Sequence, residues 1–78
     1  MFEAFVLLHL EDTSRVKELL KVEGAAEAYA VEGEYDAVVR LRAETLDKLK
    51  ECARAVRRLS FVRSTVTLIV HRTSCRTT

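Results

Sequence analysis

The sequence predicts an α+β fold in which the elements follow one another as β-α-β-β-α-β. Two observations predict it. A hairpin-like stretch centred on Gly33 and Glu34 has alternating apolar residues on both sides of its turn. A strand-helix unit precedes this hairpin and a helix-strand unit follows it. The length of 78 residues fits one domain, which we place at residues 1–72. Residues 73–78 show no periodicity, and we expect them to form a disordered tail.

The first strand and helix are predicted for residues 2–10 and for residues 12 to about 22. The strand is apolar on both faces, which indicates that both faces are covered. Asp12, Thr13 and Ser14 each supply a side chain that can cap a helix start. The helix has an apolar stripe at helical spacing, formed by Val16, Leu19 and Leu20. Gly24 follows where a helix ends in the left-handed conformation.

The hairpin strands are predicted for residues 25–32 and 36–43. Gly33 accepts a positive φ at no steric cost, and a tight hairpin turn demands one. We therefore expect a tight turn centred on Gly33 and Glu34.

The second helix is predicted to begin at Glu44 or Thr45, either of which starts a run with helical periodicity. Its apolar positions are Leu46, Leu49, Ala53, Val56 and Leu59. Apolar and polar residues then alternate over residues 61–71, which are predicted to form the fourth strand. Right-handed crossovers place both helices on one face of a four-stranded antiparallel sheet, with the first and third strands in its centre. This is the ferredoxin-like arrangement.

The other face of the sheet has no helix to cover it, although it carries large apolar side chains. An uncovered apolar face of this kind indicates an interface. We therefore expect two copies to pack their sheets face to face as a dimeric α/β barrel. The interface residues predicted from the alternation are Phe5, Leu7, Val38 and Ile69.

Composition excludes several classes of protein. The formal net charge of +1 argues against a nucleic-acid binder. The longest apolar run, residues 4–8, is too short to span a bilayer, and no signal peptide is evident, so we expect a cytoplasmic protein. Cys52 and Cys75 form no metal or redox motif, and no cofactor is predicted. We expect Cys52 to be a packing residue within a helix.

Four segments together resemble a known family: residues 4–8, residues 22–29, the hairpin Val31-Glu32-Gly33-Glu34-Tyr35-Asp36, and the closing strand Val62-Arg63-Ser64-Thr65-Val66-Thr67-Leu68-Ile69. The chain resembles the RAM (regulation of amino-acid metabolism) domain, which is the effector-binding half of Lrp/AsnC transcription regulators. The resemblance covers about residues 3–72. The Gly-Glu-Tyr-Asp turn followed at this distance by Ser-Thr-Val-Thr is its most specific part.

The resemblance implies an amino-acid-binding and oligomerisation module in transcriptional or metabolic regulation, and not an enzyme. It implies a homodimer that assembles further, often into an octamer, with the effector bound between neighbouring dimers. Full-length regulators carry a helix-turn-helix domain before this one, whereas Met1 here leads directly into the first strand. We therefore expect a stand-alone domain without direct DNA binding, which could also associate with full-length regulators.

The effector site implied by the resemblance combines the hairpin with the last strand. Asp36 could pair with an α-ammonium group, and hydroxyl groups could orient a carboxylate. Asp36 could equally serve its own turn, and threonines are favoured in strands for other reasons. The candidate residues are Gly33, Glu34, Tyr35, Asp36, Ser64, Thr65 and Thr67.

The sequence alone leaves three alternatives open. Antiparallel pairing brings His9 near Asp36 as a possible general base, although a solvated histidine at a strand end is the simpler interpretation. A small dimeric α/β-barrel enzyme shares this topology, but it would need a polar residue inside a cavity. A ligand-free assembly partner of full-length regulators would use the same sheet interface. The basic residues Arg54, Arg57 and Arg58 are interpreted as a solvated helix face, with binding of anions or of an acidic patch on a partner as the alternative.

Overall fold

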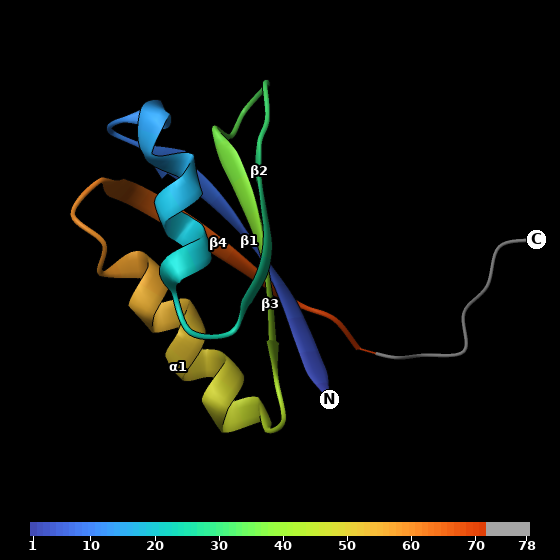
Figure 1. The fold of residues 1–78 in the computed structure, drawn as a ribbon. Coiled ribbons are helices and arrows are strands. Elements are labelled where there is room, and N and C mark those ends of the chain that lie inside the picture. Colours follow the sequence, from blue (N-terminus) through green and yellow to red (C-terminus); the bar gives the residue numbers. More distant parts are fainter. Residues whose placement is uncertain (72–78) are drawn as a thin grey trace, which may run out of the picture.

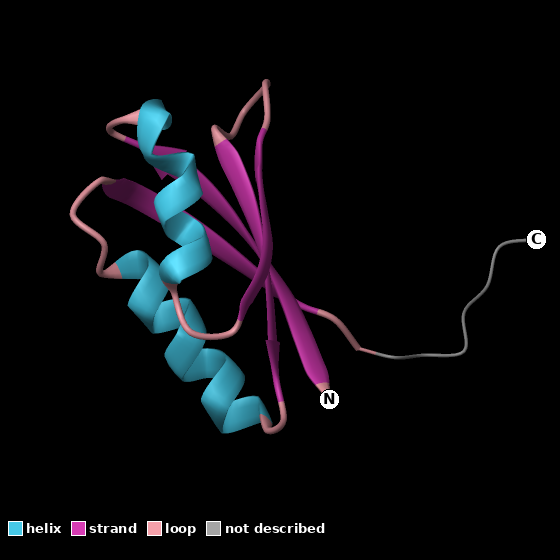
Figure 2. Ribbon diagram, in the orientation of Figure 1, coloured by secondary structure: helices cyan, strands magenta, loops and turns pink. Residues whose placement is uncertain are grey.

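The computed structural model describes residues 1–71, and the predicted tail and Cys75 lie outside the described residues. The elements are β1 (Phe2–Leu10), the 3-10 helix η1 (Thr13–Lys21), β2 (Ala25–Ala30), β3 (Ala37–Ala43), α1 (Leu46–Arg57) and β4 (Val62–Ile69) (Figure 1). The four strands form one antiparallel sheet in the order β2-β3-β1-β4. The two helices lie together on one face of this sheet (Figure 2). The predicted ferredoxin-like fold is confirmed, with β1 and β3 in the centre.

The first helix differs from the predicted α-helix. It is assigned as a 3-10 helix, and Arg15 has non-helical backbone angles within it. Residues three apart align in a 3-10 helix, so Leu19 is buried between the half-buried Val16 and Val22. Leu20, which the α-helical spacing placed on the same stripe, is 50% exposed. The predicted cap is present, because an Asp12 carboxylate oxygen accepts hydrogen bonds from the backbone N–H and the hydroxyl of Ser14.

The second helix begins at Leu46, within two residues of the predicted start at Glu44 or Thr45. Thr45 is its N-cap, and the Thr45 hydroxyl accepts a hydrogen bond of 3.1 Å from the backbone N–H of Lys48. Cys52 is buried, as expected of a packing residue, and burial raises the pKa of its thiol. The Cys52 side chain packs directly against Gly24, whose φ is +91°. The turn after η1 is thereby packed tightly against α1.

The core lies between the helices and one face of the sheet. Alternate residues of β1 and β3 point into it, and Leu19, Leu49 and Val56 meet them from the helices. The fully buried strand residues are Ala4, Val6, Leu8, Ala37, Val39 and Leu41. This core fixes the direction of every other strand side chain, because successive residues of a strand face opposite sides.

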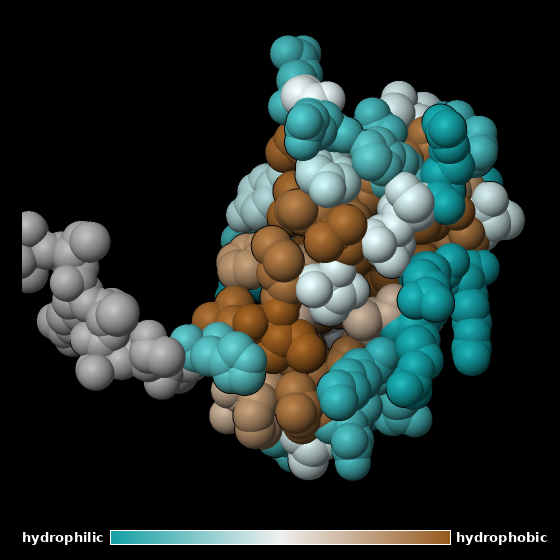
Figure 3. Space-filling view, turned by 180° about the vertical axis from the view of Figure 1, so that it is seen from behind, coloured by the Kyte–Doolittle hydropathy of each residue, from teal (hydrophilic) through white to brown (hydrophobic). Residues whose placement is uncertain are grey.

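The opposite, open face of the sheet carries exposed apolar side chains. Phe5 is 38% exposed, Val66 is 42% exposed and Leu68 is 50% exposed. The β1–β4 register pairs Phe5 with Leu68 and Leu7 with Val66, so these residues share the open face. Seen from behind, apolar residues form a continuous area of the surface (Figure 3). We refer to Phe5, Leu7, Val38, Val66 and Leu68 as the open-face patch.

The prediction that Ile69 lies on the open face is wrong. Ile69 pairs with the fully buried Ala4 and packs against the core beneath the helices. Both sets of alternate positions in β4 contain apolar residues, so the sequence pattern alone leaves the orientation of this strand ambiguous. Leu68 occupies the open-face position that was assigned to Ile69.

Candidate functional site

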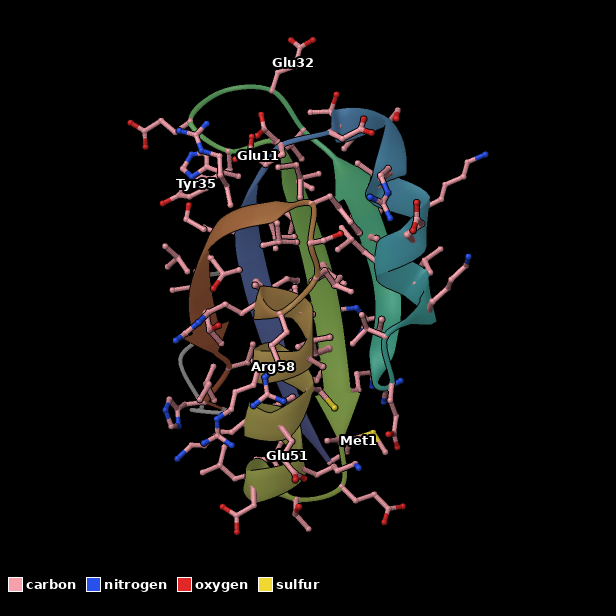
Figure 4. All side chains as sticks on the ribbon, turned by 90° about the vertical axis from the view of Figure 1, so that its left-hand side faces the viewer. Met1, Glu11, Glu32, Tyr35, Glu51 and Arg58 are labelled. Atoms are coloured by element: carbon pink, nitrogen blue, oxygen red, sulfur yellow. The ribbon has the colours of Figure 1, made fainter. Side chains whose placement is uncertain are left out.

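The connection between β2 and β3 is wider than the predicted tight turn. The strands are last paired at Ala30 and Ala37, and the Val31 N–H donates a 3.0 Å hydrogen bond to the Asp36 carbonyl. Residues 31–36 therefore form a loop closed by this bond, which we call the corner loop. Gly33 lies at its tip with a φ of +124°, as the turn prediction required. Figure 4 shows the Glu32 side chain projecting outward from the loop and Tyr35 lying lower, below the tip.

Asp36 attaches the end of the corner loop to the central strand β1. Its backbone N–H donates a 2.8 Å hydrogen bond to the Leu8 carbonyl, and its Oδ2 accepts a 2.8 Å hydrogen bond from the Leu10 N–H. The pairing of β1 with β4 shifts register between His9 and Leu10, at the same level. A bulge of this kind leaves a backbone group without a ladder partner, and the Asp36 carboxylate supplies one for Leu10.

His9 joins the corner loop to β4. Its Nδ1 lies 2.8 Å from the Ser64 Oγ, and its Nε2 makes a short hydrogen bond with the Glu34 carbonyl oxygen. The His9 and Tyr35 rings are stacked with their centroids 4.8 Å apart. The antiparallel pairing predicted from the sequence placed His9 and Asp36 at the same end of the sheet. The sequence carries no signal that His9 bonds Ser64 and Glu34 instead of pairing with the Asp36 carboxylate.

The structure brings five of the seven predicted site residues to one place. Gly33, Glu34, Tyr35 and Asp36 belong to the corner loop, and Ser64 reaches it through His9. Thr65 and Thr67 pair with Leu8 and Val6, so they face the helix side of the sheet. Thr67 there lines an open groove of about 250 Å³ between α1 and β4.

Ionic contacts surround one end of the open face. The Arg40 guanidinium donates hydrogen bonds of 2.7 Å to both Glu3 and Glu27. These two hydrogen bonds raise the pKa of Arg40 above its ordinary value. Hydrogen bonds from the Tyr29 hydroxyl and from Arg40 lower the pKa of the Glu27 carboxyl. The open-face patch is therefore bordered by charges that are already paired within the chain.

The contacts of Asp36 predict a large difference between two substitutions. Asp36→Ala leaves the half-buried Leu10 N–H without its acceptor, which should lower the free energy of unfolding by about 1–3 kcal/mol. Asp36→Asn keeps an acceptor oxygen and should lose less than half as much. Urea denaturation of the three proteins at one concentration measures both values. Equal losses in the two variants would show that the Leu10 hydrogen bond does not matter.

The described part of the chain offers neither a metal cluster nor a membrane span. No group of three or more histidine, cysteine, aspartate or glutamate side chains within residues 1–71 is arranged to hold a metal ion. Over the same residues, neither helix has the length and apolar character needed to cross a membrane.

The fold and the corner loop define a small ferredoxin-like domain with an accessible polar corner at one end of its sheet. The family profile described as the Lrp/AsnC ligand binding domain matches residues 3–78. The chain therefore belongs to the Lrp/AsnC ligand-binding domain family, and the resemblance of its sequence motifs is confirmed.

Solved structures include small domains of nearly the same length. FFRP-DM1 is 29% identical with a TM-score of 0.80, and the match covers 91% of this chain and all of that one. TTHA0845 from Thermus thermophilus is 31% identical with a TM-score of 0.76, and the match covers 97% of this chain and all of that one.

A longer regulator has the same fold in about half of its length. The feast or famine regulatory protein of M. tuberculosis, solved in complex with L-methionine, is 24% identical with a TM-score of 0.69. The match covers 97% of this chain and 54% of that one. No curated protein matches the chain significantly.

Proposed function

We propose that this chain is an effector-binding and oligomerisation module for a small molecule of the amino-acid class, acting in transcriptional or metabolic regulation. The observation that carries the proposal is the corner loop of a Lrp/AsnC ligand-binding domain, held in a defined shape by His9 and Asp36. The L-methionine complex of the M. tuberculosis regulator supports an amino acid as the class of ligand.

The corner loop offers suitable chemistry for such a ligand. Asp36 uses Oδ2 for Leu10, and Oδ1 has no hydrogen bond within the described residues, so it is available to an ammonium group. Glu34 is exposed and adds negative charge, which favours the same group. The exposed Ser64 hydroxyl oxygen has a lone pair that can accept a hydrogen bond from the ligand's ammonium group. We propose Gly33, Glu34, Tyr35, Asp36 and Ser64 as the site on this chain.

Thr65 and Thr67 lie on the opposite side of the sheet from Ser64 and His9. They face the helix side of the sheet, whereas Ser64 pairs with His9 and faces the open side. We therefore propose that these two threonines contribute to the site of a neighbouring copy. This fits a site assembled between subunits.

Self-association is part of the same proposal. The open-face patch presents Phe5, Val66 and Leu68 to solvent, each between 38% and 50% exposed. Face-to-face packing of two sheets would bury them and complete a dimeric α/β barrel. We propose this dimer as the basic unit, with further assembly into an octamer. The net charge of +1 supports a module that acts without contacting DNA directly.

An alternative function is that of a ligand-free partner of full-length regulators, and the exposed open-face patch favours it. A full-length Lrp/AsnC regulator from the same cell would then be captured on an immobilised chain whether or not an amino acid is present. Capture that depends on an amino acid would favour the effector-binding function.

A thermal-shift panel of the twenty L-amino acids, starting with L-methionine, tests the effector-binding proposal. A ligand at 100 times its dissociation constant adds about 2.7 kcal/mol to stability. For a domain of this size that corresponds to an increase in Tm of about 10 °C or more. The matched D-amino acid, which cannot place its three groups in the same way, should have little effect. If none of the twenty raises the Tm, effector binding is contradicted.

A further inference from the structure

The histidine of β1 contacts two other segments that meet at the proposed site. His9 bonds Ser64 of β4 through Nδ1 and Glu34 of the corner loop through Nε2, and its ring stacks on Tyr35. The ends of the loop are held separately by the hydrogen bond between Val31 and Asp36 and by the bonds of Asp36 to β1. Over the described residues, His9 provides the side-chain hydrogen bond to residues 32–35. The middle of the loop is thus attached to the sheet through one imidazole ring.

The partners of His9 determine where its proton lies. A backbone carbonyl oxygen can only accept a hydrogen bond, so the Nε2 that bonds Glu34 must carry a proton. In the neutral ring, Nδ1 is then an acceptor, and the Ser64 hydroxyl donates to it. The ring therefore orients the Ser64 hydroxyl and the Glu34 carbonyl at the same time. Both groups belong to the proposed ligand site.

We propose that His9 is the positioning residue of this site, which holds the corner loop against β4 in the shape that receives the effector. The inference rests on the proposed function for the effector, but the attachment of the loop can be tested without one. Loss of the Nε2–H donor should free residues 32–35, while the strands on either side keep their pairing.

Two substitutions separate the two hydrogen bonds of the ring. In His9→Asn, the short amide reaches the position of Nδ1 and can still bond Ser64, but it cannot reach Glu34. In His9→Gln, the longer amide can place its NH2 group near the position of Nε2 and donate to the Glu34 carbonyl. The first variant should release the loop and the second should retain it. A loss of packing alone would affect both variants equally.

Cleavage by a glutamate-specific protease reports on the loop, because Glu32 and Glu34 lie within it. We expect His9→Asn to be cut after these residues about fivefold faster than wild type, the factor that a typical net hydrogen bond contributes. His9→Gln should stay within about twofold of wild type. Cleavage after Glu23, an exposed residue in the turn between η1 and β2, should be unchanged and serves as the internal control.

The outcomes are distinct. Equal cleavage rates in wild type and His9→Asn, or equal acceleration in both variants, would overturn the proposal. Nitrogen NMR adds a second readout, because neutral His9 should carry its proton on Nε2, and a proton on Nδ1 would also overturn the proposal.

If an amino acid stabilises the wild type, its affinity should fall about fivefold in His9→Asn and be restored in His9→Gln. Faster loop cleavage in His9→Asn supports the positioning role even if no amino acid binds, a result that would reject the effector alone.

Discussion

Gly24→Ala should lower the free energy of unfolding by about 2–4 kcal/mol, out of a total of roughly 4–12 kcal/mol for a domain of this length. A Cβ at this position would lie 2.7 Å from the Cys52 Sγ and 3.1 Å from the Arg42 carbonyl oxygen. The φ of +91° adds backbone strain for any residue other than glycine. Urea denaturation at a fixed protein concentration measures the loss, because the proposed self-association would make stability depend on concentration.

Gly33→Ala is the matched control for this substitution. Gly33 also has a positive φ, of +124°, but a Cβ there would meet no atom within 4 Å. Gly33→Ala should therefore lower the free energy of unfolding only through backbone strain, by about 1–2 kcal/mol. Removing the sulfur in Gly24→Ala/Cys52→Ala should recover part of the loss, since the shortest contact is then absent. If both glycine variants lose the same stability and no coupling with Cys52 is found, the close packing described for Gly24 is contradicted.

Leu68→Asp should convert the proposed dimer into a monomer of 8.9 kDa without unfolding it. Leu68 is 50% exposed at the open-face patch, opposite Phe5, so the aspartate is solvated in the single chain. Packing of two sheets would bury its charge without a partner at a cost of at least about 3 kcal/mol, which weakens association more than 100-fold. Light scattering coupled to size-exclusion chromatography measures the mass, and circular dichroism reports whether the fold is kept.

Leu20→Asp is the control for this second prediction. Leu20 has the same exposed fraction, 50%, but lies on η1 on the other side of the sheet. Its substitution should leave the mass unchanged. A wild-type chain that is monomeric at micromolar concentration, or a Leu68→Asp chain with the wild-type mass, would contradict the open-face interface.

The alternation of apolar residues was sufficient to predict the fold. β1 and β3 each carry an unbroken alternate apolar set, and the β-α-β-β-α-β order with right-handed crossovers places these two strands in the centre of the sheet. The direction of the side chains in the edge strand β4 was harder to predict, because Val66 and Leu68 face the open side while Thr65 and Thr67 face the helices. This reversed the expected direction of Ile69. An edge strand at the margin of the core needs fewer apolar residues on its covered side, which explains the threonines.

The candidate site was predictable only in part. The corner loop could be located because Gly33 and the turn residues are local signals. The role of His9 depends on side chains from three segments and on a register shift between His9 and Leu10, and none of these is encoded by spacing along the chain. The first helix departed from its predicted α-helical spacing because its 3-10 geometry aligns Leu19 with Val16 and Val22 and leaves Leu20 exposed, which the local stripe does not reveal.

Hydrogen–deuterium exchange, measured on the whole protein with whichever amino acid raises its Tm most, tests most directly whether the corner loop binds the effector. At saturation, we predict slower exchange in peptides that cover residues 31–36 and Ser64, with little change over α1. Protection confined to the groove between α1 and β4, or no protection by any of the twenty amino acids, would contradict effector binding at the corner loop.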